Sequence, residues 1–141
     1  MCIGNRDGGD DGIGPYIADT LKFDSLDIKV LDCGTTPENY TAVVKRHKPK
    51  TLVFIDAADM GLAAGDIRII PKEKLGRINI STHGIPLSVF IQYLEKEVEH
   101  VILIGIQPET MFGEISKPVK KSAEQLIDLL KRKEINQIKI F

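Results

Sequence analysis

The sequence predicts an α/β protein: a three-layer α/β/α domain on a mostly parallel, twisted sheet of about five strands, with one antiparallel edge strand. Apolar runs alternate with amphipathic stretches, which is typical of parallel strands covered by helices. Residues 51–56 and 101–106 are almost wholly apolar, as expected of central strands buried on both faces. The link from residue 56 to residue 66, about ten residues long, is barely enough for a parallel crossover. The strand over residues 66–70 is therefore expected to be antiparallel and at an edge.

The other expected strands are shorter or less regular. Residues 2–3 form the stub of a first strand, which either is short or begins upstream of Met1. Residues 27–33 alternate well enough for a second strand. Residues 134–141 form either a short strand or a loose end.

Four helices are expected between these strands. A proline in the first turn and an apolar face predict a helix over residues 15–22. The second helix, over residues 36–48, has Thr36 as its expected N-cap and a proline at its first position. Apolar residues at helical spacing predict the last two helices, over residues 86–97 and 118–133.

Composition narrows the functional class. The 141 residues suffice for one domain with a hydrophobic core, and residues 1–141 are expected to form that single domain. Nineteen basic and twenty acidic residues nearly cancel, which argues against a general nucleic-acid or membrane-surface binder. No apolar run approaches the ~18 residues of a membrane span and no signal peptide opens the chain, so a cytoplasmic protein is expected. Cys2 and Cys33 lack metal-ligand spacing and are interpreted as small core residues.

Residues 4–15 form a glycine-rich turn at the expected junction of the first strand and first helix. Such a loop usually cradles a phosphate through backbone N–H groups. This one carries Asp7, Asp10 and Asp11, which would repel a phosphate but suit a cation. The loop therefore indicates metal chemistry rather than nucleotide binding.

The expected topology brings three distant residues together. Ligands of such a sheet sit beyond the carboxyl ends of its parallel strands. Asp11 follows the first strand and Asp56 ends the third. His83 lies three residues before Pro86, whose helix must start at the same end if residues 101–106 are to run parallel. Two carboxylates and an imidazole in one crevice form a credible site for a borderline divalent metal.

Four groups of segments carry a family resemblance. They are Gly4-Asn5 with residues 10–15, residues 56–61 with 65–70, residues 81–87, and residues 105–108. In these segments the chain resembles the hydrogenase maturation endopeptidases. The sequences Asp-Met-Gly-Leu and Gly-Ile-Gln-Pro are especially similar to the branch that serves formate-hydrogenlyase-type hydrogenases.

The resemblance implies a protease that removes the C-terminal extension from the large-subunit precursor of a nickel–iron hydrogenase after nickel insertion. The metal-contacting positions of the family carry over as Asp11, Asp56 and His83, which would be both the metal ligands and the catalytic residues. The free protease would carry no firmly bound metal, because the nickel arrives in the precursor, held by cysteine thiolates. We expect a monomer whose partner is that precursor.

Other polar residues have plainer interpretations. Asp7 and Asp10 are expected to be solvated or to stabilise the loop. Asp59 serves either as support for the metal site or as a turn residue, and Gln107 either contacts the substrate chain or has a structural role.

The alternative function is a non-catalytic metal- or nucleotide-binding regulatory module on the same doubly wound sheet. A basic residue or a Gly-x-Gly-x-x-Gly turn in place of the acids would favour it, and neither is present. His47 and His100 are expected at the surface, and no Ser-His-Asp or Cys-His arrangement offers another nucleophile.

Overall fold

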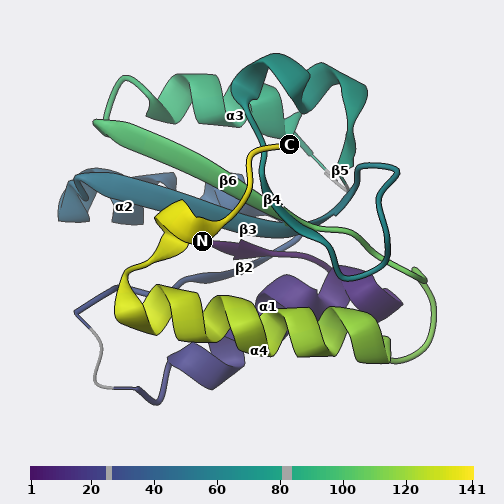
Figure 1. The fold of residues 1–141 in the computed structure, drawn as a ribbon. Coiled ribbons are helices and arrows are strands. Elements are labelled where there is room, and N and C mark those ends of the chain that lie inside the picture. The colour runs from purple at the N-terminus through teal and green to yellow at the C-terminus, as the bar shows by residue number, and fades with distance from the viewer. Residues whose placement is uncertain (25–26, 81–83) are drawn as a thin grey trace.

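The computed structural model describes residues 1–24, 27–80 and 84–141, in which a sheet lies between two layers of helices (Figure 1). The strands are β1 (Cys2–Ile3), β2 (Asp32–Gly34), β3 (Thr51–Asp59), β4 (Ile67–Ile69), β5 (Asn79–Ile80) and β6 (His100–Ile106). The α-helices are α1 (Ile13–Leu21), α2 (Thr41–His47), α3 (Leu87–Leu94) and α4 (Lys117–Arg132). Short 3₁₀ helices span Gly9–Gly12, Pro37–Tyr40, Lys72–Arg77 and Ile135–Gln137.

The main path of the sheet has five strands in the order β2-β1-β3-β6-β4. The first four strands of that path run parallel, and the β3–β6 ladder extends from Thr51↔His100 to Ala57↔Ile106. β4 is antiparallel to β6, with Arg68 opposite Gly105. The mostly parallel α/β fold and its antiparallel edge strand are therefore confirmed.

Three strands differ from the sequence prediction by more than one residue at an end. β2 covers only Asp32–Gly34 rather than residues 27–33, and β3 runs on to Asp59. β5, which the sequence did not predict, pairs antiparallel with the end of β3, with Ile80 opposite Ala58. A strand of two residues is too short to show a period of two, which is why its pattern was missed.

The C-terminal tail covers the outer side of β4. Ile140 forms a parallel bridge with Ile69. The amide of Ile69 donates to the carbonyl of Lys139, and the amide of Phe141 donates to the carbonyl of Ile69, both at 2.9 Å. The tail thus satisfies backbone groups that an open sheet edge would expose.

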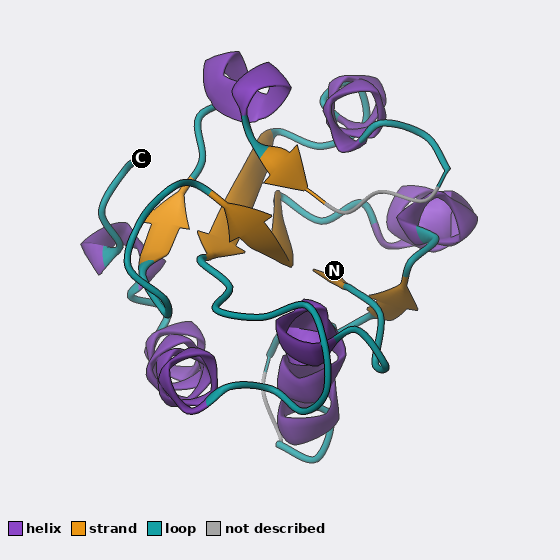
Figure 2. Ribbon diagram, turned by 90° about the vertical axis from the view of Figure 1, so that its right-hand side faces the viewer, coloured by secondary structure: helices purple, strands orange, loops and turns teal. Residues whose placement is uncertain are grey.

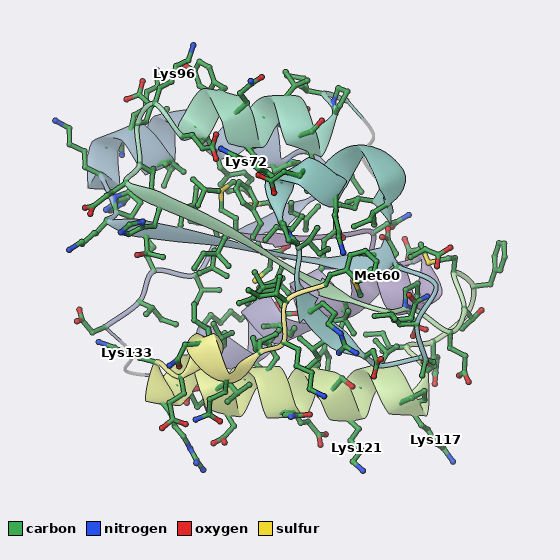
Figure 3. All side chains as sticks on the ribbon, turned by 45° about the horizontal axis from the view of Figure 1, so that its top comes forward. Met60, Lys72, Lys96, Lys117, Lys121 and Lys133 are labelled. Atoms are coloured by element: carbon green, nitrogen blue, oxygen red, sulfur yellow. The ribbon has the colours of Figure 1, made fainter. Side chains whose placement is uncertain are left out.

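Each face of the sheet has its own helix pair (Figure 2). α1 and α4 cover one face and α2 and α3 the other, as their separate clusters of buried side chains show. The expected helix over 36–48 divides into a 3₁₀ turn and α2, and the side chain of Thr36 makes no capping hydrogen bond. Figure 3 shows Lys117 and Lys121 of α4 projecting away from the sheet, and both are exposed, as expected of a solvated face.

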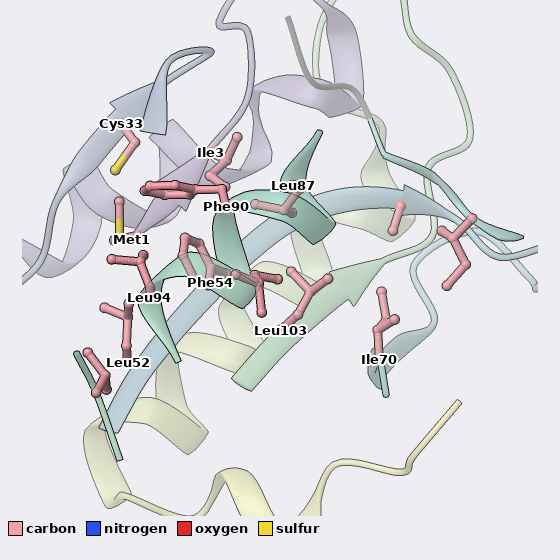
Figure 4. Packing of buried hydrophobic residues seen from close by; sticks show 14 of the residues in the cluster. Met1, Ile3, Cys33, Leu52, Phe54, Ile70, Leu87, Phe90, Leu94 and Leu103 are labelled. Atoms are coloured by element: carbon pink, nitrogen blue, oxygen red, sulfur yellow. The ribbon is translucent and has the colours of Figure 1, made fainter. Parts of the chain in front are cut away.

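The core beneath α3 is close-packed (Figure 4). Phe54 of β3 and Phe90 of α3 meet edge to face, with ring centroids 6.0 Å apart. Cys2 and Cys33 are buried and free, and burial raises the pKa of the Cys33 thiol to about 12. Both thiols are therefore small core residues, as predicted. Within the described part of the chain, no helix is long and apolar enough to cross a membrane.

Candidate active site

The acidic loop is held against the carboxyl end of β1 by a close backbone contact. The chain leaves the sheet at Gly4, whose φ is 141°. A Cβ atom on Gly4 would lie 1.8 Å from the carbonyl oxygen of Asp11, so no other residue fits without moving the loop. The short β1 and its glycine thus deliver Asp11 to the predicted end of the sheet.

Asp10 anchors this loop to the segment between β6 and α4. Its fully buried carboxylate accepts four hydrogen bonds. The donors are the amide of Ser116 at 2.6 Å, the amides of Glu109 and Thr110 at 2.7 and 3.0 Å, and the hydroxyl of Ser116 at 2.9 Å. The expectation that Asp10 stabilises the loop is confirmed, whereas Asp7 lies exposed.

Asp11 is almost completely buried, with 3% of its surface exposed. Its Oδ2 accepts a hydrogen bond from the backbone N–H of Asn5 at 2.9 Å. Because Asn5 directly follows the Gly4 turn, this bond fixes the carboxylate relative to the end of β1.

Asp56 is a fully buried carboxylate inside β3. It lies three residues before the end of that strand, which corrects the prediction that it ends the strand. Among the described residues, no side chain donates a hydrogen bond to either of its carboxylate oxygens. Burial raises the pKa of Asp56 well above its usual range, and the negative charge of Asp11 raises it further, although the backbone of Ala57 partly opposes both effects.

The structure therefore brings together two members of the predicted trio, Asp11 and Asp56. Because burial and the charge of Asp11 both disfavour the ionised form of Asp56, the Asp56 carboxylate favours either a retained proton or a nearby cation. This donor chemistry fits a divalent ion.

His83, the third predicted residue, lies outside the described residues. Ile80, the last described residue before His83, pairs with Ala58 near the end of β3. The prediction for His83 depended on a parallel strand over residues 101–106, and β6 does run parallel to β3. Within residues 1–24, 27–80 and 84–141, no group of three or more His, Cys, Asp or Glu side chains is placed to hold a metal ion.

Gln107, the residue after β6, joins the ends of two strands. Its Oε1 accepts from the amides of Met60 and Leu62 at 2.7 and 3.2 Å, and its Nε2 donates to Asp59 at 3.0 Å. This bond, with a second from the amide of Gly61, lowers the pKa of Asp59. Both side chains therefore hold the turn after β3, which is the structural interpretation of each.

A groove of about 470 Å³ lies beside these turns, and we call it the end groove. It is lined by Ala57, Asp59, Ile78, Ile80, Gln107, Pro108, Glu109, Thr110 and Met111. Ala57 directly follows Asp56 in β3, so the groove lies at the same end of the sheet as the buried carboxylate, although consecutive strand residues project to opposite faces. Neither Asp11 nor Asp56 itself lines it.

Arg6 is a site-adjacent residue that the sequence analysis did not single out. It forms salt bridges with Asp19 and Asp32 beside a cavity of about 400 Å³ at the ends of β1 and β2. Its guanidinium lowers the pKa of Asp19 to about 2. The signal in the sequence that could have identified Arg6 is that it is the single basic residue of the acidic loop over residues 4–15. His47 and His100 are exposed, as expected.

Comparisons with known proteins agree with this architecture. A family described as hydrogenase maturation protease matches residues 15–133. The hydrogenase 3 maturation protease of Escherichia coli K12 is 34% identical, over 92% of this chain and 86% of its own length. A crystal structure of the hydrogenase 3 maturation protease superposes with a TM-score of 0.90 at 33% identity, covering 99% of this chain and 92% of the other. The nickel–iron hydrogenase maturation protease HycI of Thermococcus kodakarensis gives 0.81 at 35% identity, covering 94% and 88%. The chain belongs to the hydrogenase maturation protease family.

Proposed function

We propose that this protein is the endopeptidase that removes the C-terminal extension of a nickel–iron hydrogenase large-subunit precursor after nickel insertion. The observation that carries the proposal is the pairing of the fully buried Asp56 with Asp11 at the carboxyl end of the sheet. The names of its relatives describe the maturation of hydrogenases, and the E. coli relative is named for the maturation of hydrogenase 3.

The carboxylate pair suits recognition of a metal that arrives with the substrate. Asp11 and Asp56 would place their oxygens, and His83 an imidazole nitrogen, around the nickel of the precursor. Two carboxylates and one imidazole form a weak site for a borderline ion, so cysteine thiolates of the precursor would supply much of the affinity. The nickel would then locate the peptide bond to be cut, and the three residues would be both ligands and catalytic groups.

The other expectations belong to the same proposal. Residues 1–141 act as one protease domain and as a monomer in the cytoplasm, with the precursor as partner and without nucleic acid or membrane. The free protein binds no metal firmly. Cadmium, zinc or nickel added in excess would occupy the carboxylate pair weakly.

The test is co-expression with candidate large-subunit precursors, with the precursor then weighed by intact-mass spectrometry. We expect one cut near its C-terminus with the wild-type protein. Asp11→Asn and Asp56→Asn should leave the precursor at full length, whereas Asp7→Asn, at an exposed position of the same loop, should process it normally. Full processing by both site variants would contradict the assigned roles, and an uncut precursor with every protein would favour a non-catalytic binding module.

A further inference from the structure

We propose that the segment over residues 108–116, which we call the docking arm, holds the precursor chain in the end groove beside its cleavage site. Met111 and Phe112 form the tip of this arm. The inference rests on the proposed function and assigns to it a surface that recognises the substrate.

Phe112 is the most exposed of the large apolar side chains in the described structure, with 84% of its surface in solvent, and its neighbour Met111 is 40% exposed. A single exposed apolar residue needs no explanation by itself. What distinguishes this one is how firmly its backbone is held.

Hydrogen bonds to the acidic loop fix the backbone of the arm. Asp10 accepts hydrogen bonds from Glu109, Thr110 and Ser116, so one buried carboxylate holds both ends of the arm. Gly9 packs against its tip, because a Cβ there would lie 2.6 Å from the backbone nitrogen of Phe112. The same nitrogen donates to the hydroxyl of Thr110 at 3.2 Å.

A pinned backbone that presents a solvent-exposed ring is a preorganised anchor. A partner that covers the ring buries its apolar surface, and little conformational entropy is lost because the loop is already ordered. Aromatic side chains in this situation often dominate the energy of an interface.

The position of the arm identifies the occupant. Thr110 and Met111 line the end groove together with Ala57 of β3, and the loop that holds the arm through Asp10 also carries Asp11 of the carboxylate pair. A chain lying in the groove would therefore pass along the end of the sheet that carries the carboxylate pair. The occupant to which this continuity points is the precursor segment next to the scissile bond.

The chemistry of the groove limits that segment. Ile78 and Ile80 provide apolar surface, while Asp59 and Glu109 provide negative charge. Hydrogen bonds from Gln107 and Gly61 favour the ionised form of Asp59. An acidic segment would be repelled, so the groove fits an extended chain that is apolar with neutral or basic side chains.

Phe112→Ala tests the arm directly. Processing rates over a range of nickel-loaded precursor concentrations should show a KM raised by about tenfold or more. The value of kcat should stay within roughly twofold, because the ring touches no reacting group. The thermal unfolding midpoint should be unchanged, and Phe112→Tyr should restore most of the lost affinity.

The matched control is Phe23→Ala. Phe23 follows α1 at the opposite end of the sheet and is 82% exposed. Its substitution therefore removes the same ring from an equally exposed position. A KM for Phe112→Ala equal to that of wild type, or an equal rise in Phe23→Ala, would overturn the docking arm while leaving the proposed function intact. A wild-type protein that does not cut the precursor would overturn the proposed function, and with it this inference.

Discussion

Asp56, fully buried on β3, is within electrostatic reach of Asp11, and its pKa is raised first by burial and further by the negative charge of Asp11. Among the described residues no side chain donates a hydrogen bond to it, and the backbone of Ala57 opposes the shift only in part. The free protein thus holds a carboxylate in a position where its ionisation costs stability. Such local destabilisation at a functional site is retained when the site needs it for binding.

Asp56→Asn should stabilise the protein while abolishing processing. The amide keeps the shape of the side chain and cannot ionise. We expect the free energy of unfolding at pH 7 to rise by about 1–3 kcal/mol, the scale of a buried polar group without a partner. Urea unfolding in the presence of a chelator would measure it, with Asp7→Asn as the exposed control. A less stable variant would contradict this account of the site.

That gain in stability should depend on pH. Folding raises the pKa of Asp56, so near pH 4 and below Asp56 stays protonated in the folded state and costs little folding free energy. As the pH rises, the unfolded state ionises first, and the wild-type protein loses stability until the pH passes the folded-state pKa. The difference between Asp56→Asn and wild type should therefore grow from pH 4 to pH 7. A difference that shrinks over this interval would show that folding does not raise this pKa.

Asp10→Ala should be destabilising, by about 3 kcal/mol or more. It removes an acceptor of four hydrogen bonds and leaves three backbone N–H groups with no partner in place of the carboxylate. The thermal unfolding midpoint measures the effect, and Asp7→Ala serves as the exposed control. If the two midpoints fell equally, Asp10 would not anchor the arm.

Gly4→Ala should both destabilise the protein and impair processing, because the added Cβ would displace the backbone of Asp11. Two glycines separate the possible causes. Gly34 has a positive φ but open space around a Cβ, and Gly76 has open space and no positive φ. Processing assays should rank the alanine variants with Gly4 the worst, Gly34 mildly affected and Gly76 normal. Normal processing by Gly4→Ala would contradict the role of the close contact.

His83→Ala should abolish processing and weaken the binding of added cadmium or zinc, while the unfolding midpoint remains that of wild type. Intact mass of the precursor measures the processing, and isothermal titration with cadmium measures the metal binding. His100→Ala, exposed at the far end of β6, is the control. Full processing by a well-folded His83→Ala protein would remove His83 from the site.

Much of this architecture could be predicted from the sequence because its signals are strong. The apolar runs of β3 and β6 and the short link to β4 gave the parallel core and the antiparallel edge. The juxtaposition of Asp11 and Asp56 followed from the rule that parallel strands end together.

The remainder depended on tertiary contacts that leave little trace in sequence. β5 has two residues and pairs only with the end of β3, so no period could reveal it. The hydrogen bonds that Ser116 donates to Asp10 span 106 residues, and the two salt bridges of Arg6 depend on the positions of α1 and β2. Gln107 satisfies amides 45 and 47 residues away in sequence, which its own segment could not indicate.

The measurement that tests the central claim most directly is the intact mass of one precursor, prepared with and without nickel and incubated with this protein. We expect a single C-terminal cut in the nickel-loaded precursor and none in the nickel-free form. Brief chelator treatment of the protease, followed by removal of the chelator, should not change the result. Equal cleavage of both forms would contradict the claim that the protease recognises the metal carried by its substrate.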